Sequence, residues 1–147
     1  MASQVYWVKP PSTLVNPLKQ YREKALVAIY AAAGYVGQQM QDSARRRAIW
    51  DDRTGNARSG LFFAVDGFGL APIIGQTGKM DFGLKTKAAG EGAIISGTTD
   101  RLVLALSHTM WYGQYLELSN GGRFAIIMST MEAHLPRLES LLKKVFT

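Results

Sequence analysis

The glycines of this chain are concentrated in its middle, and this distribution constrains the fold more than any other feature of the sequence. Of the 15 glycines, all except Gly34 and Gly37 fall between Gly55 and Gly122. Glycine weakens the interior of a helix and favours turns and tight bends. The sequence therefore predicts a helical first third, followed by a middle region of short strands and turns.

The first third predicts one long helix that extends from residue 17 to about residue 49. Asn16 and Pro17 are typical of a helix start, because asparagine caps and proline tolerates the first helical position. Small and apolar residues then recur at three- and four-residue spacings, which indicates one continuous stripe. They are Tyr21, Ala25, Ala28, Ile29, Ala32, Val36 and Met40.

The middle of this helix is apolar on every side, which raises the question of a membrane span. The uncharged stretch 25–41 has 17 residues, three of them glutamines, and is shorter than the ~20 apolar residues that a span requires. We therefore expect no membrane partner. A helix covered on both sides by protein, partly by a neighbouring subunit, explains the pattern.

The N-terminal residues 1–16 predict an extended arm, since prolines at positions 10 and 11 disfavour helix. Trp7 is expected to dock either on another protein or back on its own domain. The total length of 147 residues fits one domain. We expect that domain to comprise residues 17–147.

Four short runs in the middle of the chain predict strands: residues 61–65, 93–96, 101–107 and 123–128. Residues 97–100 and 119–122 have the composition of turns. Run 101–107 is apolar on both faces, which is typical of a central strand. These runs predict one antiparallel sheet of about four strands.

The last segment, residues 129–146, predicts an amphipathic helix. Ser129 and Glu132 have the spacing of a capping box, and Pro136 predicts a kink or a later start. One face carries Met131, Leu135, Leu138, Leu142 and Val145. The predicted fold class is therefore α+β, with a long N-terminal helix and a C-terminal helix packed on the sheet.

Residues 66–92 form a long segment interrupted by glycines, and its apolar content is too high for a solvent loop. We interpret it as a hairpin-like tongue that becomes ordered against a partner, and we expect its large apolar residues to contact that partner. They are Phe68, Leu70, Ile73, Ile74, Met80, Phe82 and Leu84.

The sequence offers few residues for catalysis or for metal binding. It has no cysteine and two histidines, which excludes thiolate chemistry and a histidine cage. His108 is expected to be packed or hydrogen-bonded, and a small hydrolase that uses it is the weakest alternative. We predict no catalytic residue, no metal site and no cofactor.

The net charge of +6 arises mostly from residues 1–50, which hold seven Lys/Arg against two acids. The run Arg45, Arg46 and Arg47 has two interpretations. Arginines at a helix C-terminus complement the helix dipole, and a basic face also suits a nucleic acid or an acidic protein. A nucleic-acid-binding module that uses this basic end is therefore the alternative function.

Two short segments carry a resemblance to a known family. Residues 53–61 read Arg-Thr-Gly-Asn-Ala-Arg-Ser-Gly-Leu, and residues 112–118 read Tyr-Gly-Gln-Tyr-Leu-Glu-Leu. With the helix before them and the helix after them, they resemble the neck or tail-completion (head–tail joining) proteins of long-tailed bacteriophages, small structural proteins of the siphophage connector. Ala57 stands where that family has leucine, and Ser119 stands where it has glycine.

The resemblance implies a non-enzymatic virion protein that forms a ring at the phage neck and has a tail-completion or tail-terminator role. It implies a homo-oligomer, six-fold or alternatively twelve-fold, between head-closure or connector proteins and tail-tube or tail-terminator proteins. Genomic DNA would pass through the ring, and assembly would take place in the host cytoplasm. The turn and structural residues that it implies are Arg53, Thr54, Gly55, Asn56, Tyr112, Tyr115 and Glu117. An ion pair of Arg53 with Glu117 would tie the two segments together.

Overall fold

The computed structural model of the protein describes residues 6, 8, 11–50, 56–78, 97–110 and 112–147. The helical elements are η1 (Pro11–Leu14), α1 (Val15–Arg47), α2 (Asn56–Ser59), α4 (Gly113–Leu118), η2 (Asn120–Gly122) and α5 (Ile127–Val145). The strands are β1 (Leu61–Gly67), β2 (Leu70–Ile74) and β3 (Leu102–His108). The predicted α+β class, with a long N-terminal helix and a C-terminal helix, is confirmed.

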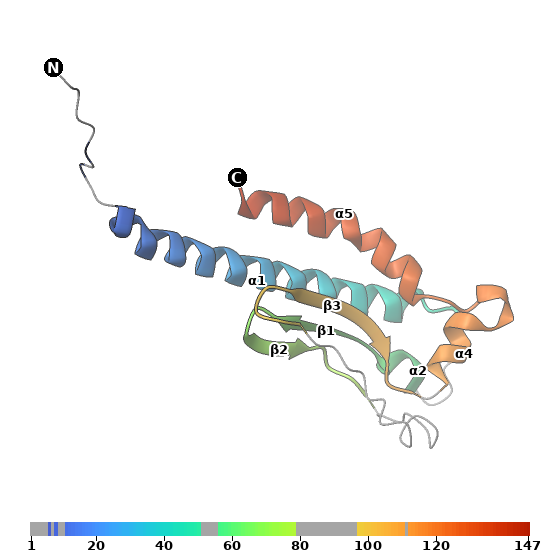
Figure 1. Cartoon of the computed structure of the whole chain (residues 1–147). Helices are drawn as coiled ribbons and strands as arrows, with labels where there is room; N and C mark the ends of the chain where they lie inside the picture. The colour runs from blue at the N-terminus through green and yellow to red at the C-terminus, as the bar shows by residue number, and fades with distance from the viewer. Residues whose placement is uncertain (1–5, 7, 9–10, 51–55, 79–96, 111) are drawn as a thin grey trace.

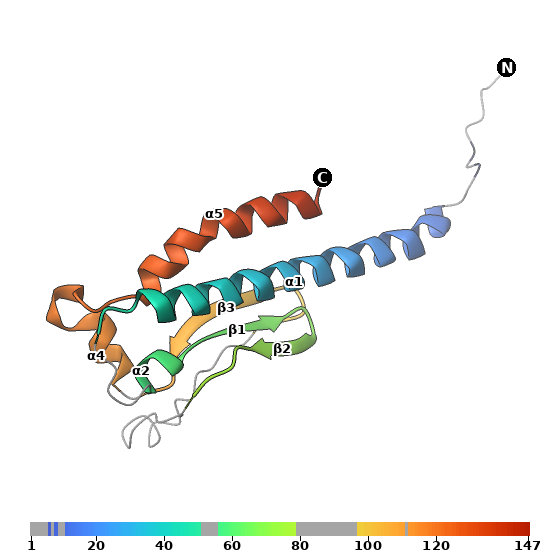
Figure 2. The ribbon, with the colours of Figure 1, turned by 180° about the vertical axis from the view of Figure 1, so that it is seen from behind.

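The elements form three layers with α1 in the middle. The sheet lies on one side of α1 and α5 lies on the other, as both views of the ribbon show (Figures 1 and 2). The C-terminal helix therefore packs mainly on α1 rather than on the sheet, which differs from the prediction. Both covering layers lie over the C-terminal half of α1, and its N-terminal half extends beyond them.

The described strands form an antiparallel sheet in the order β2-β1-β3. The central strand is β1 and not the predicted run 101–107, which forms β3 at one side of these three strands. Phe63 pairs with Leu106 and Val65 with Leu104, so these apolar residues lie on the same face. The predicted strand 93–96 lies outside the described residues. The predicted turn 97–100 is confirmed by a bridge between Thr98 and Arg101.

The predicted strand 123–128 is wrong, and its β-type residues lead into α5 instead. Gly121 and Gly122 have φ values of 65° and 76°, a region that glycine adopts without strain. They belong to the predicted turn 119–122, which the structure confirms as a short helical turn. From Ile127 onward the chain is helical through Pro136, so α5 begins before the predicted capping box.

The inner face of α5 also differs from the predicted one. Met131 and Leu138 pack against the core as expected, together with Leu141. Leu135, which the sequence assigned to the same face, is 45% exposed. The apolar residues of this helix therefore form a broad stripe, and α1 covers the part of it that carries Met131, Leu138 and Leu141.

The core lies between α1 and the sheet. Val36, Met40 and Ala44 of α1 and Leu61 and Val65 of β1 have no exposed surface. Gly37 lets the sheet approach closely, since a Cβ atom at this position would collide with the ring of Phe63 and lie 3.0 Å from Leu104 Cδ1. The small residues of α1 thus serve contacts within one chain in this region.

The β1–β2 connection is a two-residue hairpin within the predicted tongue. Gly67 pairs with Leu70, and the residues between them, Phe68 and Gly69, have φ values of 57° and 69°. Two positive φ values define a type I′ turn, which matches the twist of the flanking strands. Phe68 N donates a hydrogen bond to Thr98 O at 2.7 Å. Residues 67–74 are therefore part of the sheet, whereas residues 79–92 of the tongue lie outside the described residues.

A pair of glycine substitutions tests the packing of α1 on β1. Gly37→Ala should lower the free energy of unfolding by about 1–3 kcal/mol, because the added methyl group overpacks the core at Phe63. At Gly34 the nearest atom to an added Cβ is the tip of the Ile73 side chain at 3.0 Å. Gly34→Ala should therefore be neutral or stabilising by up to about 1 kcal/mol, from the higher helix propensity of alanine. Denaturant unfolding checks both values, and equal losses would contradict this packing.

Candidate assembly interface

Two side chains of α1 bind the backbone of the sheet and fix how the helix lies on it. Gln41 is 1% exposed. Its Oε1 accepts a hydrogen bond from Phe63 N at 3.0 Å, and its Nε2 donates to Gln76 O at 3.1 Å. Arg45, one turn later, donates to three backbone carbonyls: Leu61 O at 2.8–3.0 Å, Ser59 O at 2.9 Å and Gln76 O at 2.6 Å. We call Gln41 and Arg45 the polar clamp.

The polar clamp accounts for one member of the basic run. Burial lowers the pKa of Arg45, an effect that the nearby Asp42 carboxylate opposes. An arginine stays charged despite such a shift, so its hydrogen bonds to carbonyls are charge-assisted and strong. Arg45 thus belongs to the fold, and the nucleic-acid alternative is left with Arg46 and Arg47, both exposed.

Arg46 also lines a polar cleft between α1 and α5. The cleft has a volume of about 340 Å³. Its lining residues are Gln39, Asp42, Ser43, Arg46 and His134. Because an acidic and a basic side chain share this small space, the cleft is not the uniformly basic surface that phosphate backbones select.

The predicted turn after α1 is described only from Asn56, since Arg53, Thr54 and Gly55 lie outside the described residues. Asn56 begins α2. From this short helix Arg58 donates to Arg45 O at 2.6 Å and to Trp50 O at 3.2 Å. Arg45 O lies in the last turn of α1, where carbonyls have no helical partner, and a guanidinium group there also complements the helix dipole. The second arginine of the segment therefore caps α1.

The segment around Glu117 connects α4 to the start of α5. Tyr112 precedes α4, and Tyr115 and Glu117 lie on it. The Glu117 carboxylate accepts hydrogen bonds from Ile126 N at 2.7 Å and from Ile127 N at 3.1 Å. It therefore caps α5, in place of the predicted capping box. The predicted partner Arg53 lies outside the described residues, so the ion pair stays a prediction.

His108 is held by hydrogen bonds, as the sequence predicted. Its Nδ1 accepts from Met110 N at 3.0 Å, so its Nε2 carries the proton and donates to Ala57 O at 2.7 Å. The ring centroid lies 5.8 Å from that of Tyr112 and 6.5 Å from that of Trp50. Both ring nitrogens are used within the fold, which disfavours the hydrolase alternative at this residue.

The N-terminal half of α1 is the least covered part of the described fold. Every residue from 12 to 24 is exposed, and the first buried residue of α1 is Ala33. Large apolar residues are among them: Leu14, Leu18 and Tyr21 are 56%, 65% and 60% exposed. We call residues 14–28 the α1 overhang.

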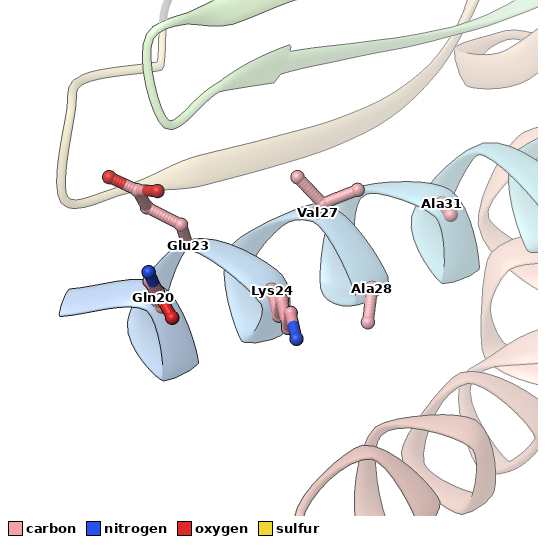
Figure 3. Close-up of a pocket in the computed structure, with 6 residues that line it drawn as sticks. All are labelled: Gln20, Glu23, Lys24, Val27, Ala28 and Ala31. Carbon is pink, nitrogen blue, oxygen red and sulfur yellow. The ribbon is translucent and has the colours of Figure 1, made fainter. Parts of the chain in front are cut away.

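Figure 3 shows the inner part of the overhang and the turn of α1 that follows it, where the side chains of Ala28 and Ala31 leave the helix backbone open to approach. A groove of about 410 Å³ lies along this stretch of helix. Its lining residues are Gln20, Glu23, Lys24, Val27, Ala28 and Ala31. An open apolar helix surface of this kind is suited to a second helix.

The sequence did not predict the overhang, although the length of the first helix indicates it. Residues 15–47 form a helix of about 50 Å, whereas the seven-residue strands cover about 23 Å and the 19 residues of α5 about 28 Å. A helix that is much longer than its partners must extend beyond them. From its sequence, the apolar middle of this helix is instead expected to be covered on both sides, partly by a neighbouring subunit.

The apolar residues assigned to the tongue have different environments. Ile73 packs against the core, Phe68 and Leu70 are half-buried at the hairpin, and Ile74 is 63% exposed. Met80, Phe82 and Leu84 lie outside the described residues, as does Trp7. Among the described large apolar residues of the tongue, Ile74 is thus the most exposed.

Comparisons with protein-family models, with curated proteins and with solved structures find no match to this chain. Within the described residues, no helix is long and apolar enough to cross a membrane. The same part of the chain contains no group of three or more histidine or acidic residues placed to hold a metal ion. The resemblance to phage neck proteins therefore rests on the two short segments alone.

Substitutions of the adjacent residues Arg45 and Arg46 test the polar clamp. Arg45→Lys should lower the free energy of unfolding by about 1.5–3 kcal/mol, because a lysine cannot reach three carbonyls with a planar fork. Arg46→Lys, at an exposed position without a described partner, should change it by less than about 0.5 kcal/mol. Thermal and denaturant unfolding measure both, and a tolerated Arg45→Lys would show that the clamp is dispensable.

Substitutions of Glu117 test the cap on α5. Glu117→Ala should cost about 1–2 kcal/mol of stability, since two backbone N–H groups lose their acceptor. Glu117→Gln keeps one acceptor oxygen and should lose less. Glu139→Ala, at an exposed position of α5, serves as the control. Amide hydrogen exchange should show faster exchange confined to the first turn of α5. An unchanged exchange rate at Ile126 and Ile127 would contradict the cap.

Proposed function

We propose that this protein is a non-enzymatic virion component that assembles into a ring at the head–tail junction of a long-tailed phage, in a tail-completion or tail-terminator role. The observation that carries the assembly part is the α1 overhang. The phage neck, its virion location and its neighbouring connector and tail proteins follow from the resemblance of residues 53–61 and 112–118.

The overhang supports an assembly function for two reasons. It exposes apolar surface, and it belongs to α1, whose C-terminal half is fixed to the rest of the fold. Contiguous exposed apolar surface marks sites of protein–protein contact. The polar clamp, the Arg58 cap and the close approach at Gly37 hold the C-terminal half of α1. The overhang therefore presents its side chains in a fixed direction, which a partner binds with little loss of conformational entropy.

A nucleic-acid-binding function is the second candidate, since Arg46 and Arg47 stay exposed at the end of α1. Two arginines beside Asp42 form a small basic surface, whereas phosphate contacts in a binding module are more numerous. DNA that passes through the proposed ring would make weak, salt-sensitive contacts of this kind. Arg46→Gln/Arg47→Gln should therefore reduce DNA affinity without changing assembly.

Ring formation is tested with the purified protein by sedimentation velocity and electron microscopy. The wild-type chain should form closed rings, six-fold or twelve-fold, in a concentration-dependent manner. Leu18→Asp/Tyr21→Asp should prevent assembly and leave the thermal midpoint unchanged, because both side chains are exposed in the subunit. Ala133→Asp/Ser140→Asp adds the same charge at exposed positions of α5 and should assemble normally. A wild-type protein that stays monomeric at high concentration would contradict self-assembly.

A further inference from the structure

We propose that the α1 overhang of one copy packs on the outward face of α5 of the next copy, in a head-to-tail contact. This inference deepens the proposed function, on which it rests, by naming the two surfaces that meet. The outward face of α5 is defined by Met128, Glu132, Leu135, Glu139 and Phe146.

The overhang presents an apolar stripe with basic borders. Leu14, Leu18 and Tyr21 follow one another at spacings of four and three residues, so they lie on one face of the helix. Arg22 and Lys24 border this face on its two sides. Arg22 makes an exposed ion pair with Asp100 at 3.2 Å, and Lys24 has no ion pair within the described residues.

The outward face of α5 presents the complementary pattern. Met128, Leu135 and Phe146 are 64%, 45% and 60% exposed. Their spacings of seven and eleven residues are close to two and three whole turns, which places them on one face. Glu132 and Glu139 lie on that face between them. Neither carboxylate forms an ion pair with another described residue.

Charge selects the head-to-tail pairing over the symmetric one. The overhang carries Lys19, Arg22 and Lys24 against Glu23, so two overhangs would repel each other. The α5 face contributes two carboxylates, Glu132 and Glu139, and one lysine, Lys143, near its C-terminal end, so its net charge is opposite in sign to that of the overhang. Apolar stripes with opposite flanking charges attract and fix the pairing.

The geometry requires that the two surfaces belong to different copies. The inner face of α5 packs on α1 of its own chain through Met131 and Leu138. Met128, Leu135 and Phe146 lie beside that face, on a side of the helix that α1 does not cover. The overhang extends past the end of the sheet (Figures 1 and 2). A contact between unlike surfaces repeats from copy to copy and closes into a ring or grows as a filament.

The small size of the contact favours a closed ring. The overhang has 15 residues, about 22 Å of a helix about 10 Å wide. Such a contact buries far less than the ~1,200 Å² of stable pairs. Two copies therefore bind weakly, whereas in a ring each copy makes two contacts and no surface is left open.

Site-directed crosslinking tests the pairing directly, because the natural chain contains no cysteine. A Tyr21→Cys chain is mixed with a Leu135→Cys chain, and a short bismaleimide crosslinker is added. The mixture should give a crosslinked heterodimer at a yield about tenfold above that of the control mixture with Ser140→Cys. Tyr21→Cys alone should give only background, and a strong Tyr21→Cys homodimer would overturn the head-to-tail arrangement.

A complementation experiment supplies a second readout. The Leu18→Asp/Tyr21→Asp chain has an intact α5 face, and a Met128→Asp/Leu135→Asp chain has an intact overhang. Each should be monomeric alone, and their mixture should show a weak one-to-one dimer that increases with concentration and does not grow further, since one contact per pair stays intact. A mixture that stays monomeric at the highest soluble concentration would overturn the proposed pairing.

These results separate the interface from the proposed function. Wild-type rings without the Tyr21–Leu135 crosslink would overturn the pairing and leave the ring function standing. A crosslink on particles that are open filaments would support the pairing and contradict the ring. Absence of both would overturn both.

Discussion

The arrangement of the whole molecule depends on the contact of the polar clamp with the backbone of the sheet. Gln41 and Arg45 reach β1 and residue 76 from one face of α1, so they join the helix to two separate segments of chain. The carbonyls that they bind would otherwise be costly to bury. Gly75 provides the space, because a Cβ atom there would collide with the Gln41 amide. Rotation of α1 by one residue would break all these contacts, and so the clamp sets which side chains the overhang presents.

Much of the fold could be predicted from the sequence, because local periodicity is strong in the two long helices. The turn at residues 97–100 could also be predicted, because its residues are typical of turns. The strand β2 was missed as a separate element since Pro72 and the nearby glycines favour a loop, and its register depends on pairing with β1. Residues 123–128 have strand-like composition, but Glu117 captures the N–H groups of Ile126 and Ile127 and starts a helix there. Such a long-range cap has no local sequence signature.

The candidate interface was predicted only in part. The sequence correctly indicated that the first helix is apolar, but the residues that we expected to contact a partner were those of the tongue and Trp7. Whether a residue is exposed depends on which helices and strands lie beside it and on how far those elements extend. Leu135 illustrates the same limit: its spacing fits the apolar stripe of α5, yet α1 covers a face centred on Leu138 and Leu141. A sequence shows the width of an apolar stripe but not which edge of it a neighbouring helix covers.

The cap formed by Glu117 has a mechanical consequence for any assembly of this chain. Because α5 is fixed at its first turn, it acts as a lever with its pivot at the Glu117 carboxylate. Over the length of its 19 residues, about 28 Å, a 10° tilt at the pivot displaces the tip by about 5 Å. Small changes in the α4 segment would thus alter the curvature between adjacent copies. Because Met131, Leu138 and Leu141 pack on the core, such a tilt also requires the contact between α5 and α1 to repack, so the cap and that contact together set the direction of the helix.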